Sequence, residues 1–219
     1  KMQNAGNRHL RIMHYGDSQI ECDRISGILR QEFQEEFGGC GVGLVPALQT
    51  VPTYTTGQTI SGEPEQFMAF GPADLRGSDN FYGPMAKRTE VWGSTITLSA
   101  RGGKDYSHSC SFNKVTILTK DAADLNLTVK GDTIELDTAN VDEMYFYTAN
   151  LERGASSATI RVNGHASILG IQLDGSRGVS VDNLPMRGCS GPELLNISRA
   201  SMSPFFAREN VGLILLQYG

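Results

Sequence analysis

The sequence contains no long apolar run and no segment rich in lysine or arginine. A membrane-spanning helix needs about 20 consecutive apolar residues, so we expect no membrane span. The formal net charge is −5, from 24 acidic and 19 basic residues spread along the chain. Such a balance argues against nucleic acid as the main partner.

Cysteine is also scarce, and its four positions lie far apart: Cys22, Cys40, Cys110 and Cys189. None of them forms the C-x-x-C pair typical of zinc sites, so we expect no metal and no other cofactor. Spacing alone does not define a disulfide pairing, and buried free thiols are the common outcome for such residues.

Glycine is abundant instead, with 25 residues, which favours a turn-rich protein with much β structure. In the middle of the chain, several segments alternate apolar and polar residues, and turn residues separate them at intervals of roughly ten. This pattern predicts an antiparallel β-sandwich or jelly roll. The strand-like segments are 90–100, 111–119, 124–130, 143–148, 157–162 and 166–173.

The two ends of the chain have a different pattern, in which strands alternate with helices of 3.6-residue period. The predicted elements are strands at 9–15, 178–184 and 211–217 and helices at 20–37 and 190–207. The last strand is nearly all apolar, as expected for a buried parallel strand. We therefore predict an α/β fold interrupted by an inserted β-sandwich. The predicted domains are 1–72, 73–175 and 176–219.

The first strand leads into a Gly-Asp-Ser turn, which places Ser18 between a strand and a helix. A serine at the carboxyl end of a strand faces a crevice, and nearby N–H groups there can stabilise an oxyanion. Such a serine can attack a carbonyl carbon. The alternative is that Asp17 and Ser18 only cap the following helix, and this tripeptide alone favours capping.

With both ends considered, the sequence resembles the SGNH hydrolases, also called the GDSL lipase/acylhydrolase family. It is most similar to a bacterial GDSQ branch with an inserted carbohydrate-binding-like sandwich. Three segments carry the resemblance: HYGDSQ at 14–19, DNLPMRG at 182–188 and LILLQYG at 213–219. The resemblance implies a partial flavodoxin-like domain with parallel strands. It implies that Ser18 is the nucleophile, with the N–H groups of Ser18 and Gly188 as oxyanion donors. Asp17 would shape the turn, while Gln19 and Asn183 would line the site.

Two family blocks are not found in this sequence: the Asn of G-x-N, and the Asp-x-x-His block that supplies the base. We therefore expect that the chain is truncated after Gly219 and has little activity alone. The four histidines of this sequence are weak candidates for the missing base. His14 is expected to be structural and His9 exposed, whereas His108 and His165 fall in the sandwich. The expected parent activity is cleavage or transfer of an acyl ester, with acetyl on a polysaccharide as the first choice.

A second interpretation is a carbohydrate-binding or interaction module on a degenerate SGNH scaffold. The candidate glycan-binding residues are Trp92, Tyr106, Tyr145 and Tyr147. Tyr145 and Tyr147 share one face of their strand, although a place in the core is the default for all four. The family resemblance alone implies a periplasmic or secreted location. The sequence leaves the identity of the ester and the oligomeric state open.

Overall fold

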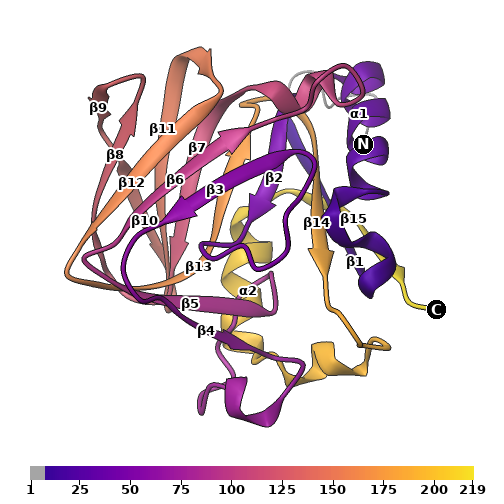
Figure 1. Ribbon diagram of the computed structural model, residues 1–219, viewed down its shortest axis with the longest axis vertical. Coiled ribbons are helices and arrows are strands. Elements are labelled where there is room, and N and C mark those ends of the chain that lie inside the picture. The colour runs from indigo at the N-terminus through magenta and orange to yellow at the C-terminus, as the bar shows by residue number, and fades with distance from the viewer. Residues whose placement is uncertain (1–7) are drawn as a thin grey trace.

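The protein is built mainly from β-strands in three sheets (Figure 1). The computed structural model describes residues 8–219. Two antiparallel sheets form a sandwich. The larger has seven strands, ordered β10–β11–β7–β13–β5–β4 with β2 also paired to β13. Its strands are β2 (Gly41–Val45), β4 (Glu65–Met68), β5 (Lys87–Trp92), β7 (Phe112–Thr119), β10 (Asp137–Val141), β11 (Met144–Ala155) and β13 (His165–Asp174). The smaller sheet, in spatial order, contains β3 (Thr56–Ile60), β6 (Thr95–Ala100), β12 (Ser157–Asn163), β8 (Asp124–Val129) and β9 (Asp132–Ile134).

One hydrophobic core lies between these two sheets. Alternate residues of β12 are buried, and Ile160 pairs with Ile96 of β6. Phe112 and Ile117 of β7 belong to the same core from the opposite sheet. Full burial of one such side chain stabilises the fold by roughly 1.5–3 kcal/mol. The alternation in the sequence therefore drives the two sheets together. Five of the six predicted middle strands are confirmed, whereas the segment 90–100 is divided between β5 and β6, which belong to different sheets.

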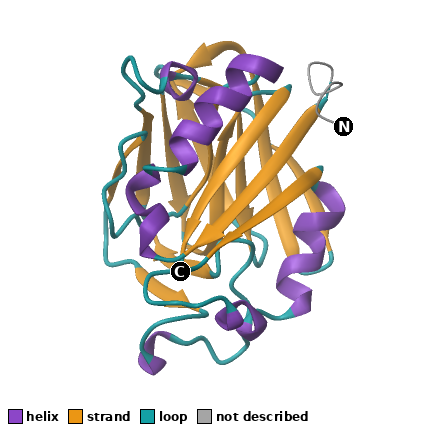
Figure 2. Ribbon diagram, turned by 90° about the vertical axis from the view of Figure 1, so that its right-hand side faces the viewer, coloured by secondary structure: helices purple, strands orange, loops and turns teal. Residues whose placement is uncertain are grey.

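A third sheet has three parallel strands in the order β14–β1–β15 (Figure 2). These strands are β1 (His9–Gly16), β14 (Gly178–Pro185) and β15 (Val211–Gln217). Leu10 and Ile12 of β1 pack in a cluster with Phe33 of α1 (Ser26–Phe37). Met13 belongs to a second cluster, which also contains Phe205 of α2 (Arg199–Arg208). The central strand β1 is thus covered on both faces.

The predicted fold class is wrong. A flavodoxin-like α/β domain requires a larger, doubly wound parallel sheet, whereas residues 8–219 contain only three parallel strands and are mostly antiparallel β. The reason is that the strand–helix segments lie only at the two ends of the chain. The domain bounds at 72 and 175 stay a prediction, although β2, β3 and β4 lie before residue 73 and pair within the antiparallel sheets. Residues 1–7 of the first predicted domain lie outside the described residues.

Both predicted helices are shorter than expected. The chain after β1 forms a distorted 3-10 segment, η2 (Ser18–Asp23), before α1 begins at Ser26. Glu21 is extended, and Cys22 and Asp23 have φ values of +63° and +65°, so the helical hydrogen-bond ladder is interrupted. Asp23 is instead held by an ion pair to Arg30. The remaining 3-10 segments are η3 (Ala73–Leu75), η4 (Ser107–Cys110) and η5 (Pro192–Asn196), the last of which replaces the start of the second predicted helix.

A buried arginine joins the parallel sheet to the sandwich. The Arg11 guanidinium is fully buried and forms ion pairs with Asp174 of β13, with Asp182 of β14 at 2.6 Å and with Glu209 after α2 at 3.3 Å. Asp182 Oδ1 also accepts a hydrogen bond from the Leu44 amide at 2.9 Å. Removing one partner of a buried ion pair costs roughly 3–5 kcal/mol. We therefore expect this cluster to fix the orientation of the parallel sheet relative to the sandwich.

Strand β15 lies at the edge of the parallel sheet, and its apolar residues are not all buried. The exposed fractions are 36% for Leu213, 45% for Ile214 and 64% for Leu216. The prediction of a parallel strand at 211–217 is confirmed, but the expectation that it is buried is wrong. Within residues 8–219, no helix is both long and apolar enough to traverse a bilayer.

Candidate active site

Ser18 lies directly after the carboxyl end of β1 and is exposed. The preceding Asp17 is mostly buried, and its Oδ1 accepts a hydrogen bond from the Gln19 amide at 2.7 Å. Its Oδ2 accepts a weaker one from the Gly219 amide at 3.4 Å. Asp17 therefore caps the turn that carries Ser18 and connects it to the segment after β15. Gln19 is exposed beside it.

The second expected segment leaves the neighbouring strand at the same edge of the sheet. Strands β1 and β14 are parallel and in register, so that Gly16 lies opposite Pro185. The Met186 amide donates to the Gly16 carbonyl at 2.8 Å, which extends the pairing past the strand ends. Gly188 follows on an exposed turn with φ of +76°, and nothing lies within 4 Å of the position of a Cβ atom. The Ser18 turn and the Gly188 turn thus leave adjacent strand ends.

An ion pair that the sequence did not suggest connects these two turns. Arg187 Nε and Nη2 donate to Glu21 Oε1 and Oε2 at 2.8 and 2.6 Å. The Glu21 side chain is 7% exposed and that of Arg187 is 67% exposed. A bidentate, charge-assisted pair fixes orientation as well as distance. Gly188 is therefore tied to η2 through the residue before it.

His14 is engaged in a buried hydrogen-bond chain. Its Nδ1 lies 2.9 Å from Ser26 Oγ, and its Nε2 lies 3.1 Å from Gln217 Oε1. The Ser26 hydroxyl in turn donates to Asn183 Oδ1 at 3.0 Å. Burial lowers the pKa of His14. Because both ring nitrogens have partners, His14 orients Ser26 and Asn183 and is not free to take a proton from Ser18.

The other histidines have partners elsewhere or lie away from the turn. His9 Nε2 lies 2.7 Å from Ser180 Oγ, at the opposite end of β1 from Ser18. His165 pairs with Glu90 on the sandwich at 2.8 Å, and His108 lies in η4. Within residues 8–219, no hydrogen bond joins a histidine to Ser18. The described part of the chain thus shows no preformed serine–histidine pair.

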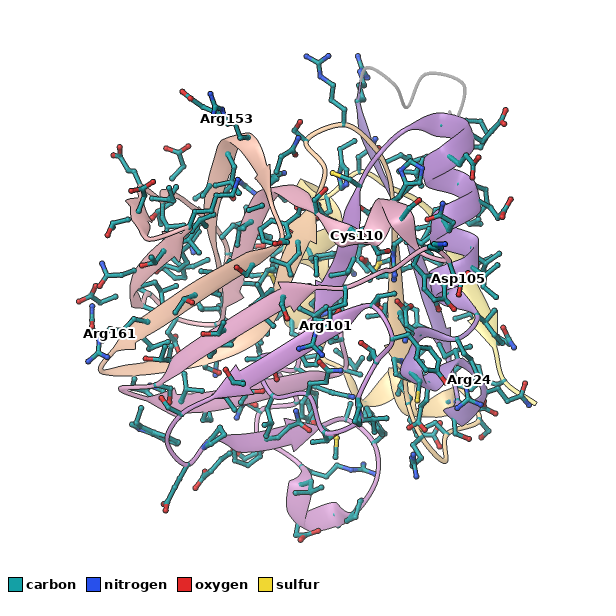
Figure 3. All side chains as sticks on the ribbon, turned by 45° about the horizontal axis from the view of Figure 1, so that its top comes forward. Arg24, Arg101, Asp105, Cys110, Arg153 and Arg161 are labelled. Carbon is teal, nitrogen blue, oxygen red and sulfur yellow. The ribbon has the colours of Figure 1, made fainter. Side chains whose placement is uncertain are left out.

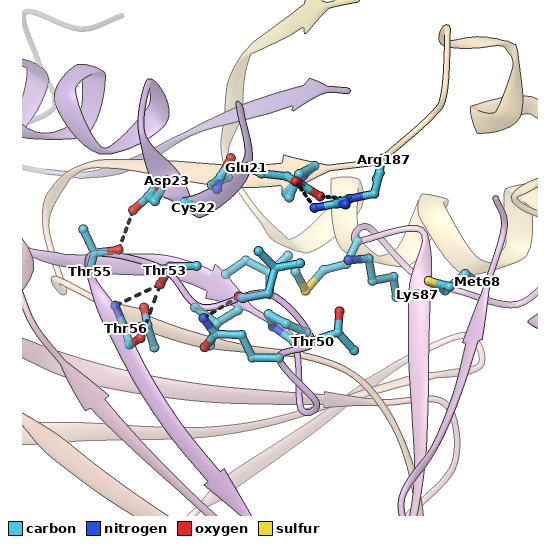
Figure 4. A pocket seen from close by; sticks show the side chains of 18 of the residues that line it. Glu21, Cys22, Asp23, Thr50, Thr53, Thr55, Thr56, Met68, Lys87 and Arg187 are labelled. Carbon is cyan, nitrogen blue, oxygen red and sulfur yellow. Dashed lines mark hydrogen bonds and ion pairs between the residues drawn. The ribbon is translucent and has the colours of Figure 1, made fainter. Parts of the chain in front are cut away.

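A cavity of about 260 Å³ adjoins the Ser18 turn (Figure 4). One wall comes from Glu21 and Cys22 of η2, and another from Asn183 and Pro185 of β14. Asp23, Arg30 and Arg187 also line it, and the rest of the lining comes from sandwich strands and the loops beside them, mostly with apolar residues. The cavity therefore lies between the parallel sheet and the sandwich and shares residues with both candidate turns.

The four predicted glycan-binding aromatics do not form one site. Trp92 is 51% exposed, and its ring lies at a tilt of 37° to that of His165, with the centroids 5.2 Å apart. Tyr147 is buried in the sandwich core, its hydroxyl accepting from the Ala123 amide at 2.7 Å, and Tyr145 packs beside it. Tyr106 is half-buried against Gly27 of α1. The structure thus brings no two of these residues together on an exposed concave surface.

A second, more open depression contains an aromatic residue that the sequence did not suggest. Tyr54 is 62% exposed and lines this depression together with Tyr106, Arg101 and Asp105. Arg101 and Asp105 are labelled in Figure 3. Its amide donates to the Cys22 carbonyl at 3.2 Å, so it lies beside η2. Tyr54 falls in an irregular Thr- and Pro-rich stretch, where no periodic pattern marks a binding residue.

The cysteines and carboxylates show no metal site. Among residues 8–219, no group of three or more His, Cys, Asp or Glu side chains is arranged to hold a metal ion. All four cysteines are free thiols. Burial raises the pKa of Cys189, beside Gly188, to about 11. Because the thiolate is the nucleophilic form, Cys189 is a poor nucleophile at neutral pH.

The sequence matches no protein-family model and no curated protein. The fold is similar to that of a solved peptidoglycan O-acetylesterase, with a TM-score of 0.70 and 19% sequence identity. The fold is shared with an esterase. The similarity covers 100% of this chain and 58% of the other chain, so the present chain spans little more than half the length of that protein.

Proposed function

We propose that the protein is a serine ester hydrolase that removes acyl groups, acetyl foremost, from a glycan. One observation carries the proposal. The turns with Ser18 and Gly188 leave adjacent ends of in-register strands, and the Arg187–Glu21 ion pair ties them together. The fold shared with a peptidoglycan O-acetylesterase supports it, as does the resemblance of three sequence blocks to the SGNH hydrolases.

In the proposed reaction, Ser18 Oγ attacks the ester carbonyl carbon, and its proton passes to a base. The N–H groups of Ser18 and Gly188 stabilise the oxyanion, which collapses with cleavage of the bond to the alcohol oxygen. The alcohol leaves with a proton, and water then hydrolyses the acyl-serine. Both ring nitrogens of His14 already have hydrogen-bond partners, so His14 is not the base. The reaction requires another group to accept the Ser18 proton. The activity test therefore uses the full-length gene product.

The decisive variant is Ser18→Ala, assayed on p-nitrophenyl acetate and for acetate release from O-acetylated peptidoglycan. Loss of a triad serine lowers turnover on the order of a millionfold. Ser190→Ala is the matched control, because Ser190 is also exposed and lies close to Gly188 in the sequence. Full turnover in Ser18→Ala would refute the assignment, and loss in both variants would point to damage of the turn.

A carbohydrate-binding function is the second candidate, and the exposed Trp92 favours it. Exposed aromatic rings beside carboxylates suit sugar rings, and Glu90 pairs with His165, whose ring contacts that of Trp92. Retention of the protein on insoluble peptidoglycan, compared with Trp92→Ala, tests this candidate. Both functions place the protein outside the cytoplasm, where such a glycan is found, and fractionation of cells tests the location.

A further inference from the structure

Lys87 lies in the wall of the cavity beside η2, at an unusual position for a lysine. It is the first residue of β5, where the same strand face buries Thr89 and Val91. Figure 4 shows its amine pointing into the cavity beneath the Glu21–Arg187 pair. Burial lowers the pKa of Lys87 to about 8, so the amine is still mostly protonated at neutral pH. An inward-facing cation in an apolar wall is costly without a partner.

Within residues 8–219, no carboxylate forms an ion pair with Lys87, and no hydrogen bond to its ammonium is found. Its contact is the ring of Phe70, whose centroid lies 5.5 Å from Nζ. A cation over an aromatic face is stabilised, but its three N–H donors still lack an acceptor. The ammonium is therefore available to a ligand in the cavity.

The other charges around the cavity cancel in pairs. Glu21 is neutralised by the bidentate contact with Arg187, and Asp23 by Arg30 at 2.5 Å. All four of these residues line the same cavity as Lys87. Glu21 is close enough to raise the pKa of Lys87, but its carboxylate is already paired with Arg187. Lys87 is thus the one lining charge without an ion pair, and the charges that line the cavity sum to +1.

The remaining lining is mostly apolar. It includes Val42, Leu44, Val51, Met68, Phe70 and Met85. An apolar cavity with one uncompensated positive charge fits a monoanion with an apolar body, because a dianion would leave one charge unpaired in the same walls. A volume of about 260 Å³ accommodates a short aliphatic chain or one substituent of a sugar.

We propose that this cavity binds a monocarboxylate, with Lys87 as the residue that recognises the carboxylate. The apolar walls take the carbon chain, and the ammonium donates to the carboxylate oxygens. The carboxylate comes either from a free acid or from an acidic substituent of the ester substrate. Only the second source rests on the proposed function, because the cavity shares Glu21 and Asn183 with the candidate active site.

Binding of hexanoate and of the isosteric neutral hexanamide, measured by calorimetry on the purified chain, tests the inference. One charge-assisted hydrogen bond is worth about tenfold in affinity. Wild type should prefer hexanoate by about that factor below pH 8 and lose the preference well above the pKa of Lys87. Lys87→Met should abolish the preference, whereas Lys104→Met should keep it, because Lys104 is exposed and lies outside this cavity.

Equal affinity of wild type for the two ligands, or a preference that persists in Lys87→Met, would overturn the inference. If Lys87→Met does not fold, the pH series on wild type decides alone. Hexanoate binding requires no ester cleavage, so a failure of the proposed esterase activity leaves this test intact. In the full-length protein, an acidic substituent as source predicts that Lys87→Met lowers kcat/KM only for esters that carry a carboxylate. If the natural ligand is a free acid, hexanoate should inhibit ester hydrolysis by wild type but not by Lys87→Met.

Discussion

Arg187 and Glu21 lie 166 positions apart in the sequence, and a bidentate ion pair joins them beside the candidate nucleophile. Glu21 belongs to the turn that begins with Ser18, and Arg187 directly precedes Gly188. The segment between these two residues contains all strands of the sandwich, and its two ends lie side by side. We expect this contact to help set the distance between the proposed nucleophile and the proposed oxyanion donor.

Replacing Arg187 should therefore affect turnover more than folding. In Arg187→Met, the Gly188 turn loses its tie to η2, and displacement of a catalytic group by about 1 Å lowers rates on the order of a hundredfold. Ester hydrolysis by the full-length protein should fall 10- to 100-fold by this reasoning, with a modest change in urea midpoint. Arg177→Met is the control, because Arg177 is exposed and lies at the opposite end of β14. Unchanged kcat in Arg187→Met would show that the pair does not position the site.

Gly188 should tolerate asparagine better than alanine. Its φ of +76° disfavours a Cβ atom by roughly 1–2 kcal/mol, although no neighbour lies within 4 Å of that position. Asparagine adopts this conformation more readily. Gly131→Ala provides the comparison, because Gly131 has φ of +93° and equally open space in a distant hairpin. Both alanine variants should lose similar stability in denaturant unfolding, but only Gly188→Ala should lose turnover.

The Arg11 cluster should make stability depend on pH through Asp182. Burial raises the pKa of Asp182, nearby Asp174 raises it further, and its Oδ2 has no hydrogen-bond partner. Between the ordinary aspartate pKa of about 3.9 and the raised value, the folded state binds more protons than the unfolded state. The free energy of unfolding therefore falls by up to about 1.4 kcal/mol per pH unit as pH rises.

The variant Asp182→Asn lacks this term, so its stability relative to wild type should improve with rising pH above about 4. Urea unfolding from pH 4 upwards measures the difference. Asp174→Asn should behave differently. Burial raises the pKa of Asp174, but Arg11, His9 and the Ser180 hydroxyl together outweigh burial, so this pKa is lowered. The stabilisation from Asp174 is present above the ordinary aspartate pKa and is lost only as pH falls through its lowered value. If the difference in the free energy of unfolding between wild type and Asp182→Asn does not change with pH, the raised pKa of Asp182 is contradicted.

The open edge of β15 should promote self-association. Edge strands with exposed apolar residues tend to pair with other chains, and Leu216 is the most exposed of the large apolar residues of this strand. Leu216→Lys should reduce concentration-dependent association in sedimentation velocity while changing unfolding stability by no more than about 0.5 kcal/mol. Leu195→Lys is the control, because Leu195 is 87% exposed in η5 and not on a strand. An equal effect of both variants would indicate general hydrophobicity instead of strand pairing.

Local patterns in the sequence predicted most strands, because alternation in a segment such as β12 directly reflects one buried face. They did not predict the fold class, because a strand–helix pattern at the chain ends does not say how many parallel strands follow. The run 211–217 looked buried, yet its position at a sheet edge exposes Leu216. The burial of a strand depends on the elements that pack against it, and the sequence of that strand alone does not specify them.

The candidate site was predictable only where short blocks carried it. Ser18, Asp17 and Gly188 were predicted from motifs, and all three lie just beyond adjacent strand ends. Their catalytic roles stay a prediction. The Arg187–Glu21 pair and Lys87 were missed. Ion pairs between distant positions leave no periodic signal, and a single lysine in a strand reads as solvent-facing until its cavity is seen.

The distortion of η2 changes how the site handles negative charge. Because α1 begins at Ser26 and not beside Ser18, its positive end is directed at the His14–Asn183 network. The field of a helix end fades within about one turn. In the proposed reaction, an oxyanion at Ser18 would therefore depend on a few individual amides, and no helix dipole would offset the loss of one of them.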